Sequence, residues 1–155
     1  MKISIDIQVN GERYQEEVEP RMTLLEFLRQ TLHLTGTKEG CGLGDCGTCI
    51  VLLDDKPVNS CLVLAADANG RRVTTIEGLA EDGKLHPVQQ SFIDNGAVQC
   101  GFCTPAMILT SRSLLDKKTD PTEEEIKQAL GGVLCRCGSY QKILNAVQAV
   151  AKEER

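Results

Sequence analysis

The first part of the chain alternates apolar and polar side chains with the period of a β-strand. Every second residue from Ile3 to Val9 is branched and apolar, which places these side chains on one face of a sheet. Asn10-Gly11, a favoured two-residue hairpin turn, comes next, and a second run returns through residues 14–18 before Pro20. The pattern predicts an N-terminal β-hairpin.

Apolar residues between positions 23 and 34 recur with the spacing of one helix face. Thr23, with Glu26 three residues later, forms a capping-box pattern, in which each side chain accepts a hydrogen bond from a backbone amide at the start of the helix. We therefore predict a helix over residues 23–34 that packs on the sheet. Two further strands are predicted at 50–53 and 73–76, with a turn at Lys56-Pro57-Val58 that enters an edge segment.

Beyond residue 85 the apolar period changes to that of helices. Pro87 and Pro105 suit first-turn positions, and Gly96 and Gly131 suit the ends of helices. Four short helices are predicted, at 87–95, 105–117, 122–130 and 140–152. With a boundary near residues 78–85, the chain is predicted to be α+β, with a mixed sheet clasping a helix in domain 1–78 and a helical bundle in domain 79–155.

Composition and charge exclude some classes of function. The net charge of −5, the absence of tryptophan and the 3% of aromatic residues offer neither a cationic footprint nor stacking platforms for nucleic acid. The longest apolar run, at residues 61–66, is far shorter than the roughly 18 residues of a membrane span. The alternating N-terminus does not resemble a leader peptide, so we expect no membrane contact and a cytoplasmic location.

Eight cysteines dominate the candidate chemistry, and they fall into two groups of four. Without a leader, the thiols are expected in a reducing compartment, where regularly spaced cysteines hold metal more often than they form disulfides. The first group is Cys41, Cys46, Cys49 and Cys61, and the second is Cys100, Cys103, Cys135 and Cys137.

The first group has the spacing C-x4-C-x2-C with a distant fourth cysteine, which is typical of plant-type 2Fe-2S sites. Four thiolates that converge on two irons require a tightly wrapped chain, and glycines at positions 40, 42, 44 and 47 permit the positive φ values of such a loop. Their amides can also point at the sulfurs. A zinc site is the alternative, but three ligands in one nine-residue loop are unlike paired zinc knuckles.

The second group, C-G-F-C followed by a distant C-R-C, falls in the connections between predicted helices. Its spacing alone fits either one zinc ion or one 2Fe-2S cluster. Helices that begin after Cys103 and Cys137 would point positive dipole ends at the site, which favours an anionic cluster.

Three segments together resemble the iron–sulfur subunit of the molybdenum hydroxylases, the group of xanthine dehydrogenase, aldehyde oxidoreductase and aerobic carbon monoxide dehydrogenase. They are C-G-L-G-D-C-G-T-C, the segment Q-C-G-F-C-T-P that begins at Gln99, and L-C-R-C followed by Tyr140. The resemblance covers the whole chain. It implies a plant-type ferredoxin-like β-grasp domain followed by a four-helix bundle, with one 2Fe-2S cluster in each.

Residue roles follow from the same resemblance. It implies that the first group of cysteines holds the cluster nearer the flavin, and that the second group holds the cluster nearer molybdenum. Gln99 and Cys137 match positions that contact the molybdopterin of the large subunit in relatives, although Gln99 also suits a plain polar residue at a helix end. The family often has glycine, asparagine and Thr-Gly-Tyr where this chain has Ala106, Val133 and Gly138-Ser139-Tyr140. None of these differences removes a cysteine.

The remaining polar residues suggest no catalytic site. His33 and His86 have no carboxylate or serine beside them in the sequence, so we expect cap or surface roles. Arg136, between two cysteines, either offsets cluster charge or lies in solvent, and Asp45 either faces the flavin subunit or is a plain loop carboxylate.

These expectations combine into an electron-transfer subunit of a molybdenum hydroxylase complex. Electrons would pass singly from molybdopterin in a large subunit, through two 2Fe-2S clusters, to FAD in a medium subunit, with no substrate turnover by this chain alone. A hetero-oligomer is expected, with a dimer of heterotrimers as one arrangement. A free two-cluster carrier and a zinc-stabilised interaction module are the alternatives.

Overall fold

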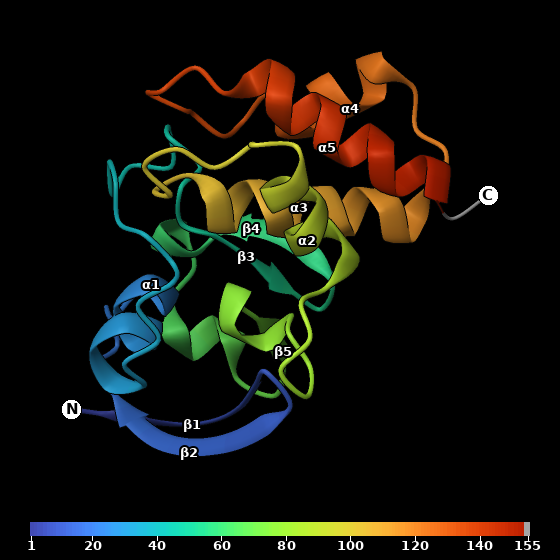
Figure 1. The fold of residues 1–155 in the computed structure, drawn as a ribbon. Coiled ribbons are helices and arrows are strands. Elements are labelled where there is room, and N and C mark those ends of the chain that lie inside the picture. Colours follow the sequence, from blue (N-terminus) through green and yellow to red (C-terminus); the bar gives the residue numbers. More distant parts are fainter. Residues whose placement is uncertain (154–155) are drawn as a thin grey trace.

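The computed structural model describes residues 1–153, which form a sheet half and a helical half joined side by side (Figure 1). The hairpin at the N-terminus is confirmed. Strand β1 (Ile3–Val9) pairs antiparallel with β2 (Glu12–Val18), and Asn10 and Gly11 both take positive φ in the turn. Alternate residues of β1 are buried, as the period-two pattern requires.

The sheet has five strands in the order β2-β1-β5-β3-β4. Strand β5 (Arg72–Thr74) runs parallel to β1 and antiparallel to β3 (Ile50–Leu53), so the predicted mixed sheet is confirmed. The strand predicted at 73–76 is shorter than expected, because the 3-10 turn η4 (Ile76–Gly78) follows it.

The turn predicted at Lys56-Pro57-Val58 is wrong. Those residues lie in the edge strand β4 (Lys56–Asn59), and the turn is made one step earlier by Asp54 and Asp55, both with positive φ. Aspartate tolerates this conformation better than most residues. Pro57 fits because β4 pairs only with β3, so its missing amide hydrogen costs no bond to a second neighbour.

The helix on the sheet begins as predicted but is not a regular α-helix. Thr23 and Glu26 form the capping box, and α1 (Leu24–Glu26) passes at once into the π-helical turn η1 (Phe27–Thr31). It ends before Leu34 because His33 takes a φ of 58°, which no right-handed helix accommodates. Phe27 and Leu28 are fully buried against the sheet.

Four helices build the second half, each within one residue of its predicted bounds at either end: α2 (Pro87–Asp94), α3 (Thr104–Lys117), α4 (Glu123–Leu130) and α5 (Tyr140–Glu153). His86 caps α2, accepting the Val88 amide on Nδ1, so the expected cap role of this histidine is confirmed. Thr122 and Glu125 form another capping box at the start of α4.

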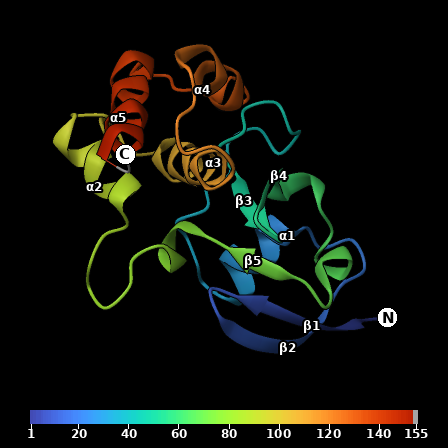
Figure 2. The ribbon, with the colours of Figure 1, turned by 90° about the vertical axis from the view of Figure 1, so that its right-hand side faces the viewer.

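Helix α3 joins the two halves. It lies between the sheet and the pair α4 and α5 (Figures 1 and 2), and it contacts β3 and β4. Leu52 of β3 is buried in the helical core, and Ser113 of α3 donates a hydrogen bond to the Asp55 carbonyl at 3.2 Å. The two cores are therefore packed together, which fixes the cysteine loops of the two halves relative to each other. Among residues 1–153, no helix has the length and apolarity to cross a bilayer.

Candidate metal centres

The first group of cysteines lies on the loop between η1 and β3, with Cys61 on the 3-10 turn η2 (Ser60–Leu62). Backbone amides of this loop turn toward one sulfur. The amides of Leu43, Asp45 and Cys46 donate to Cys41 Sγ at 3.3, 3.3 and 3.4 Å. Three donors on one sulfur stabilise a thiolate there, which is the form that binds metal.

Glycine is required at two kinds of place in this loop. Gly42, Gly44 and Gly47 have φ between 66° and 82°, so the predicted positive φ values are confirmed at these three positions. Gly40 is required for space instead, because a Cβ there would lie 2.7 Å from Cys46 Sγ and 2.8 Å from Thr48 Oγ1.

Two thiols of the first group have pKa values that are shifted in opposite directions. Amides of Cys46 and Leu43 lower the pKa of the Cys41 thiol to about 6. Burial raises the pKa of the Cys61 thiol to about 11, and a hydrogen bond with Cys49 and the charges of Cys49 and Cys41 add to the shift. The charges of Cys49 and Cys41 act on the Cys61 thiol, and a cation held between these sulfurs would relieve that repulsion.

Side chains that the sequence did not single out hold this loop in place. Asn59 donates to the Gly44 carbonyl at 3.2 Å, and buried Ser60 donates to the Cys49 carbonyl at 2.7 Å. Buried Thr48 lies 3.1 Å from Cys46 Sγ. Their proximity to cysteines in the sequence is the only signal that could have marked them.

The second group converges in the same way. Burial raises the pKa of the Cys103 thiol to about 12, and a hydrogen bond with Cys135 and the charges of Cys135 and Cys100 contribute. The Cys100 amide lowers the pKa of Cys137, but the Cys100 thiol, burial and neighbouring charges together raise it. Cys103 is the cap residue before α3, so the positive end of that helix faces this group as predicted.

All eight cysteines are free thiols, which excludes a disulfide framework in this structure. Within residues 1–153, no three histidine, cysteine, aspartate or glutamate side chains lie at the spacing of a single bound metal ion. Each group supplies four thiols, and backbone amides donate to one sulfur in each: Cys41 in the first group and Cys100 in the second. Such a donor set fits an anionic, thiolate-bound cluster.

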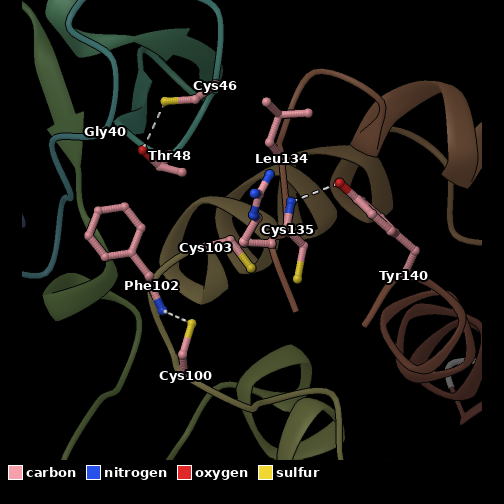
Figure 3. A pocket seen from close by; sticks show the side chains of 10 residues that line it. Gly40, Cys46, Thr48, Cys100, Phe102, Cys103, Leu134, Cys135 and Tyr140 are labelled. Atoms are coloured by element: carbon pink, nitrogen blue, oxygen red, sulfur yellow. Dashed lines mark hydrogen bonds between the residues drawn. The ribbon is translucent and has the colours of Figure 1, made fainter. Parts of the chain in front are cut away.

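The loops that carry the two cysteine groups contact each other. The Leu134 amide donates to the Cys46 carbonyl at 2.9 Å, so one hydrogen bond joins the two cysteine loops. Buried Gly47 touches Gly132, where any Cβ would overlap the Gly132 carbonyl oxygen. A cavity of about 370 Å³ opens beside this contact, lined by residues of both groups (Figure 3).

Comparisons with known proteins agree with both sites. Residues 7–79 match a 2Fe-2S iron-sulfur cluster binding domain, and residues 75–148 match a second [2Fe-2S] binding domain. The chain is 50% identical to the nicotinate dehydrogenase small FeS subunit of Eubacterium barkeri, over 95% of this chain and 94% of that one. It is 46% identical to the nicotine 6-hydroxylase small subunit of Paenarthrobacter nicotinovorans, over 94% and 88%.

A solved structure is also similar to this chain in fold and in sequence. Quinoline 2-oxidoreductase from Pseudomonas putida 86 superposes with a TM-score of 0.94 at 43% identity, covering 97% of this chain and 94% of that one. The chain belongs to the iron–sulfur small subunits of the molybdenum hydroxylases. As a member of this family, it carries two 2Fe-2S clusters and transfers electrons within an oxidoreductase of several subunits, including larger partners. The predicted family, fold class and clusters are therefore confirmed.

Gln99 has a partner inside this small subunit. Its side-chain nitrogen donates to the hydroxyl of Ser139 at 2.8 Å, and Ser139 is buried. Gln99 therefore ties the Cys100 loop to the Cys137 loop. Its amide oxygen has no such bond within residues 1–153, so it is free to accept from a group outside the chain.

The differences from the common family pattern fall in different environments. Ala106 and Val133 are buried in the helical core, at 0% and 1% exposed, so they cannot contact a partner. Exposed Gly138 has a φ of 74°, which glycine accommodates without strain.

Proposed function

We propose that Cys41, Cys46, Cys49 and Cys61 bind one 2Fe-2S cluster, and that the second group, Cys100, Cys103, Cys135 and Cys137, binds the other. When bound, each cluster accepts and releases one electron at a time. The grouping of four free thiols in each half, with backbone amides donating to Cys41 Sγ and to Cys100 Sγ, supports this assignment. The division into domains 1–78 and 79–155 is proposed on the same basis, with one cysteine group in each.

The order of the two sites along the electron path is part of the proposal. The second group faces the larger, molybdopterin-binding subunit, because Cys100 and Cys137 are both exposed there and Gln99 keeps a free amide oxygen beside them. We propose that Gln99 and Cys137 contact the pterin. The first group faces a medium subunit that binds FAD, where Leu43 and Leu62 stand 72% and 63% exposed at its rim.

The observation that carries the function is the hydrogen bond from the Leu134 amide to the Cys46 carbonyl. The connection between the two groups is therefore short. It runs from the backbone of Cys46, through one hydrogen bond of 2.9 Å, to Leu134, which directly precedes Cys135. The protein thus holds two one-electron sites in series and contributes ligation, position and electrostatics. We propose no catalytic residues in this chain, and we expect the isolated chain not to turn substrate over.

The test is to purify the assembly through a tag on this chain and to analyse its cofactors. We expect larger chains that bring molybdenum and FAD in amounts equal to this chain, and no substrate oxidation by the tagged chain alone. A chain that contains iron but runs as a monomer, without molybdenum or flavin, would instead identify a free carrier. We place the complex in the cytoplasm, because eight thiols kept for metal require reducing conditions.

A further inference from the structure

The side chain of Thr48 is buried beside the sulfur of Cys46 in the first cysteine loop. Its Oγ1 lies 3.1 Å from Cys46 Sγ, within hydrogen-bonding distance of the sulfur, and the residue is only 5% exposed (Figure 3). Buried hydroxyl groups in proteins are normally hydrogen-bonded, and this sulfur is the partner that the structure gives to Thr48. The contact is therefore a specific one between a side chain and a cysteine sulfur.

The loop is shaped to admit this contact. Gly40 lies directly against the pair, since a Cβ at this position would come within 2.7 Å of Cys46 Sγ and 2.8 Å of Thr48 Oγ1. Any side chain at position 40 would therefore displace the sulfur, the hydroxyl or the loop itself. The glycine allows the hydroxyl and the sulfur to meet.

The role of Cys46 decides which of the two atoms donates. A cysteine that binds iron is a thiolate without a hydrogen, so its sulfur can only accept, and the Thr48 hydroxyl donates. The bond stabilises negative charge on the sulfur, and it is strengthened by its buried surroundings. Because an added electron makes a cluster more negative, the bond stabilises the reduced state more than the oxidised state. Hydrogen bonds of this kind raise the reduction potential.

The contact lies on the side of the first group that faces the second group. Thr48 and Cys46 line the cavity of about 370 Å³ together with Cys100 and Cys103 (Figure 3). The carbonyl of Cys46 also accepts the Leu134 amide, which joins the two loops. The hydroxyl therefore acts on the cysteine of the first group that contacts the loop of the second group.

We propose that Thr48 acts on the first cluster through Cys46, as a positioning residue: its hydroxyl donates to Cys46 Sγ and raises the reduction potential of that cluster. The inference rests on the proposed assignment of Cys46 as a ligand. An electron passes from the second cluster to the first more readily when the first has the higher potential. The hydroxyl thus favours the electron-transfer step between the two clusters.

The test is the Thr48→Val variant of the full chain loaded with iron and sulfide. Valine keeps the branched shape and replaces the hydroxyl with a methyl group. We expect both clusters to be present, the midpoint potential of the first to move to more negative values, and that of the second to stay unchanged. Thr48→Ser keeps a hydroxyl and should restore the first potential. The potentials are read by redox titration followed by EPR, with the first signal assigned as the one that Cys46→Ala abolishes.

Thr110→Val is the matched control, because Thr110 is also 5% exposed and its hydroxyl has no hydrogen-bond partner within residues 1–153. It should leave both potentials unchanged. An unchanged first potential in Thr48→Val, an equal shift of both clusters, or the same shift in Thr48→Ser would overturn the role of the hydroxyl. If Cys46→Ala removes neither signal, the ligand assignment itself is wrong, which is a different result.

A second variant covers loss of the first cluster in Thr48→Val. A methyl group is larger than a hydroxyl, and Gly40 leaves little room beside it. Thr48→Ala removes the hydroxyl and adds no atom in its place. The first potential should again move to more negative values, and a first potential equal to that of the unmodified chain contradicts the proposal.

Discussion

Replacing Cys135 with alanine should remove the second cluster and leave the first. The iron content falls from about four to about two per chain, and one of the two EPR signals of the reduced protein disappears. Because the sites lie in series, substrate-dependent reduction of the flavin in the complex should fall to background, while molybdenum stays bound to its own subunit. Metal analysis, EPR and a flavin-reduction assay check these results together.

Arg136→Ala is the control for this variant, because Arg136 is exposed and directly follows Cys135. It should keep all the iron and both EPR signals. If Cys135→Ala also keeps both signals, the four thiols of the second group do not bind a cluster as proposed. If it loses both signals, the two halves do not load independently.

Gly47→Ala should separate the two cysteine loops. A Cβ at this position would overlap the Gly132 carbonyl oxygen, which cannot move aside as a flexible side chain would. The strain of a positive φ costs about 1–2 kcal/mol, and the overlap adds about 1–3 kcal/mol. The hydrogen bond from the Leu134 amide to the Cys46 carbonyl should break, which weakens the magnetic coupling between the two reduced clusters.

Gly42→Ala separates these two effects. Gly42 has nearly the same φ, 66° against 69°, but a Cβ there has nothing within 4 Å. It should cost the φ strain alone, about 1–2 kcal/mol, and leave the coupling unchanged. The two variants are compared by thermal unfolding and by EPR of the fully reduced chain. If Gly47→Ala and Gly42→Ala lose equal amounts of stability and of magnetic coupling, the contact between the two loops is unimportant.

Elements that depend on local sequence were predictable. The hairpin turn at Asn10-Gly11, the capping box at Thr23 and the four helices of the second half follow from residues that are neighbours in the chain. The turn at Asp54 and Asp55 was missed because Pro57 is the stronger turn signal in the sequence. Only the position of β4 at the edge of the sheet shows that this proline belongs in a strand.

The candidate sites, too, were predictable only where the signal lies in the local sequence. The spacing of the first four cysteines indicated a 2Fe-2S cluster without further help, whereas the second four left zinc open until the resemblance to the family was considered. The contacts between Leu134 and Cys46, Gln99 and Ser139, and Tyr140 and Cys135 could not be predicted from spacing. Each depends on how α3 and α5 bring separate loops together.

The most direct test of two one-electron sites in series is a reductive titration of the anaerobically purified chain, followed by EPR and metal analysis. We predict about four irons, no zinc, and an uptake of about two electrons per chain, one by each of two EPR-distinct clusters. Uptake of only one electron, or a colourless chain that contains zinc in place of iron, would contradict this prediction.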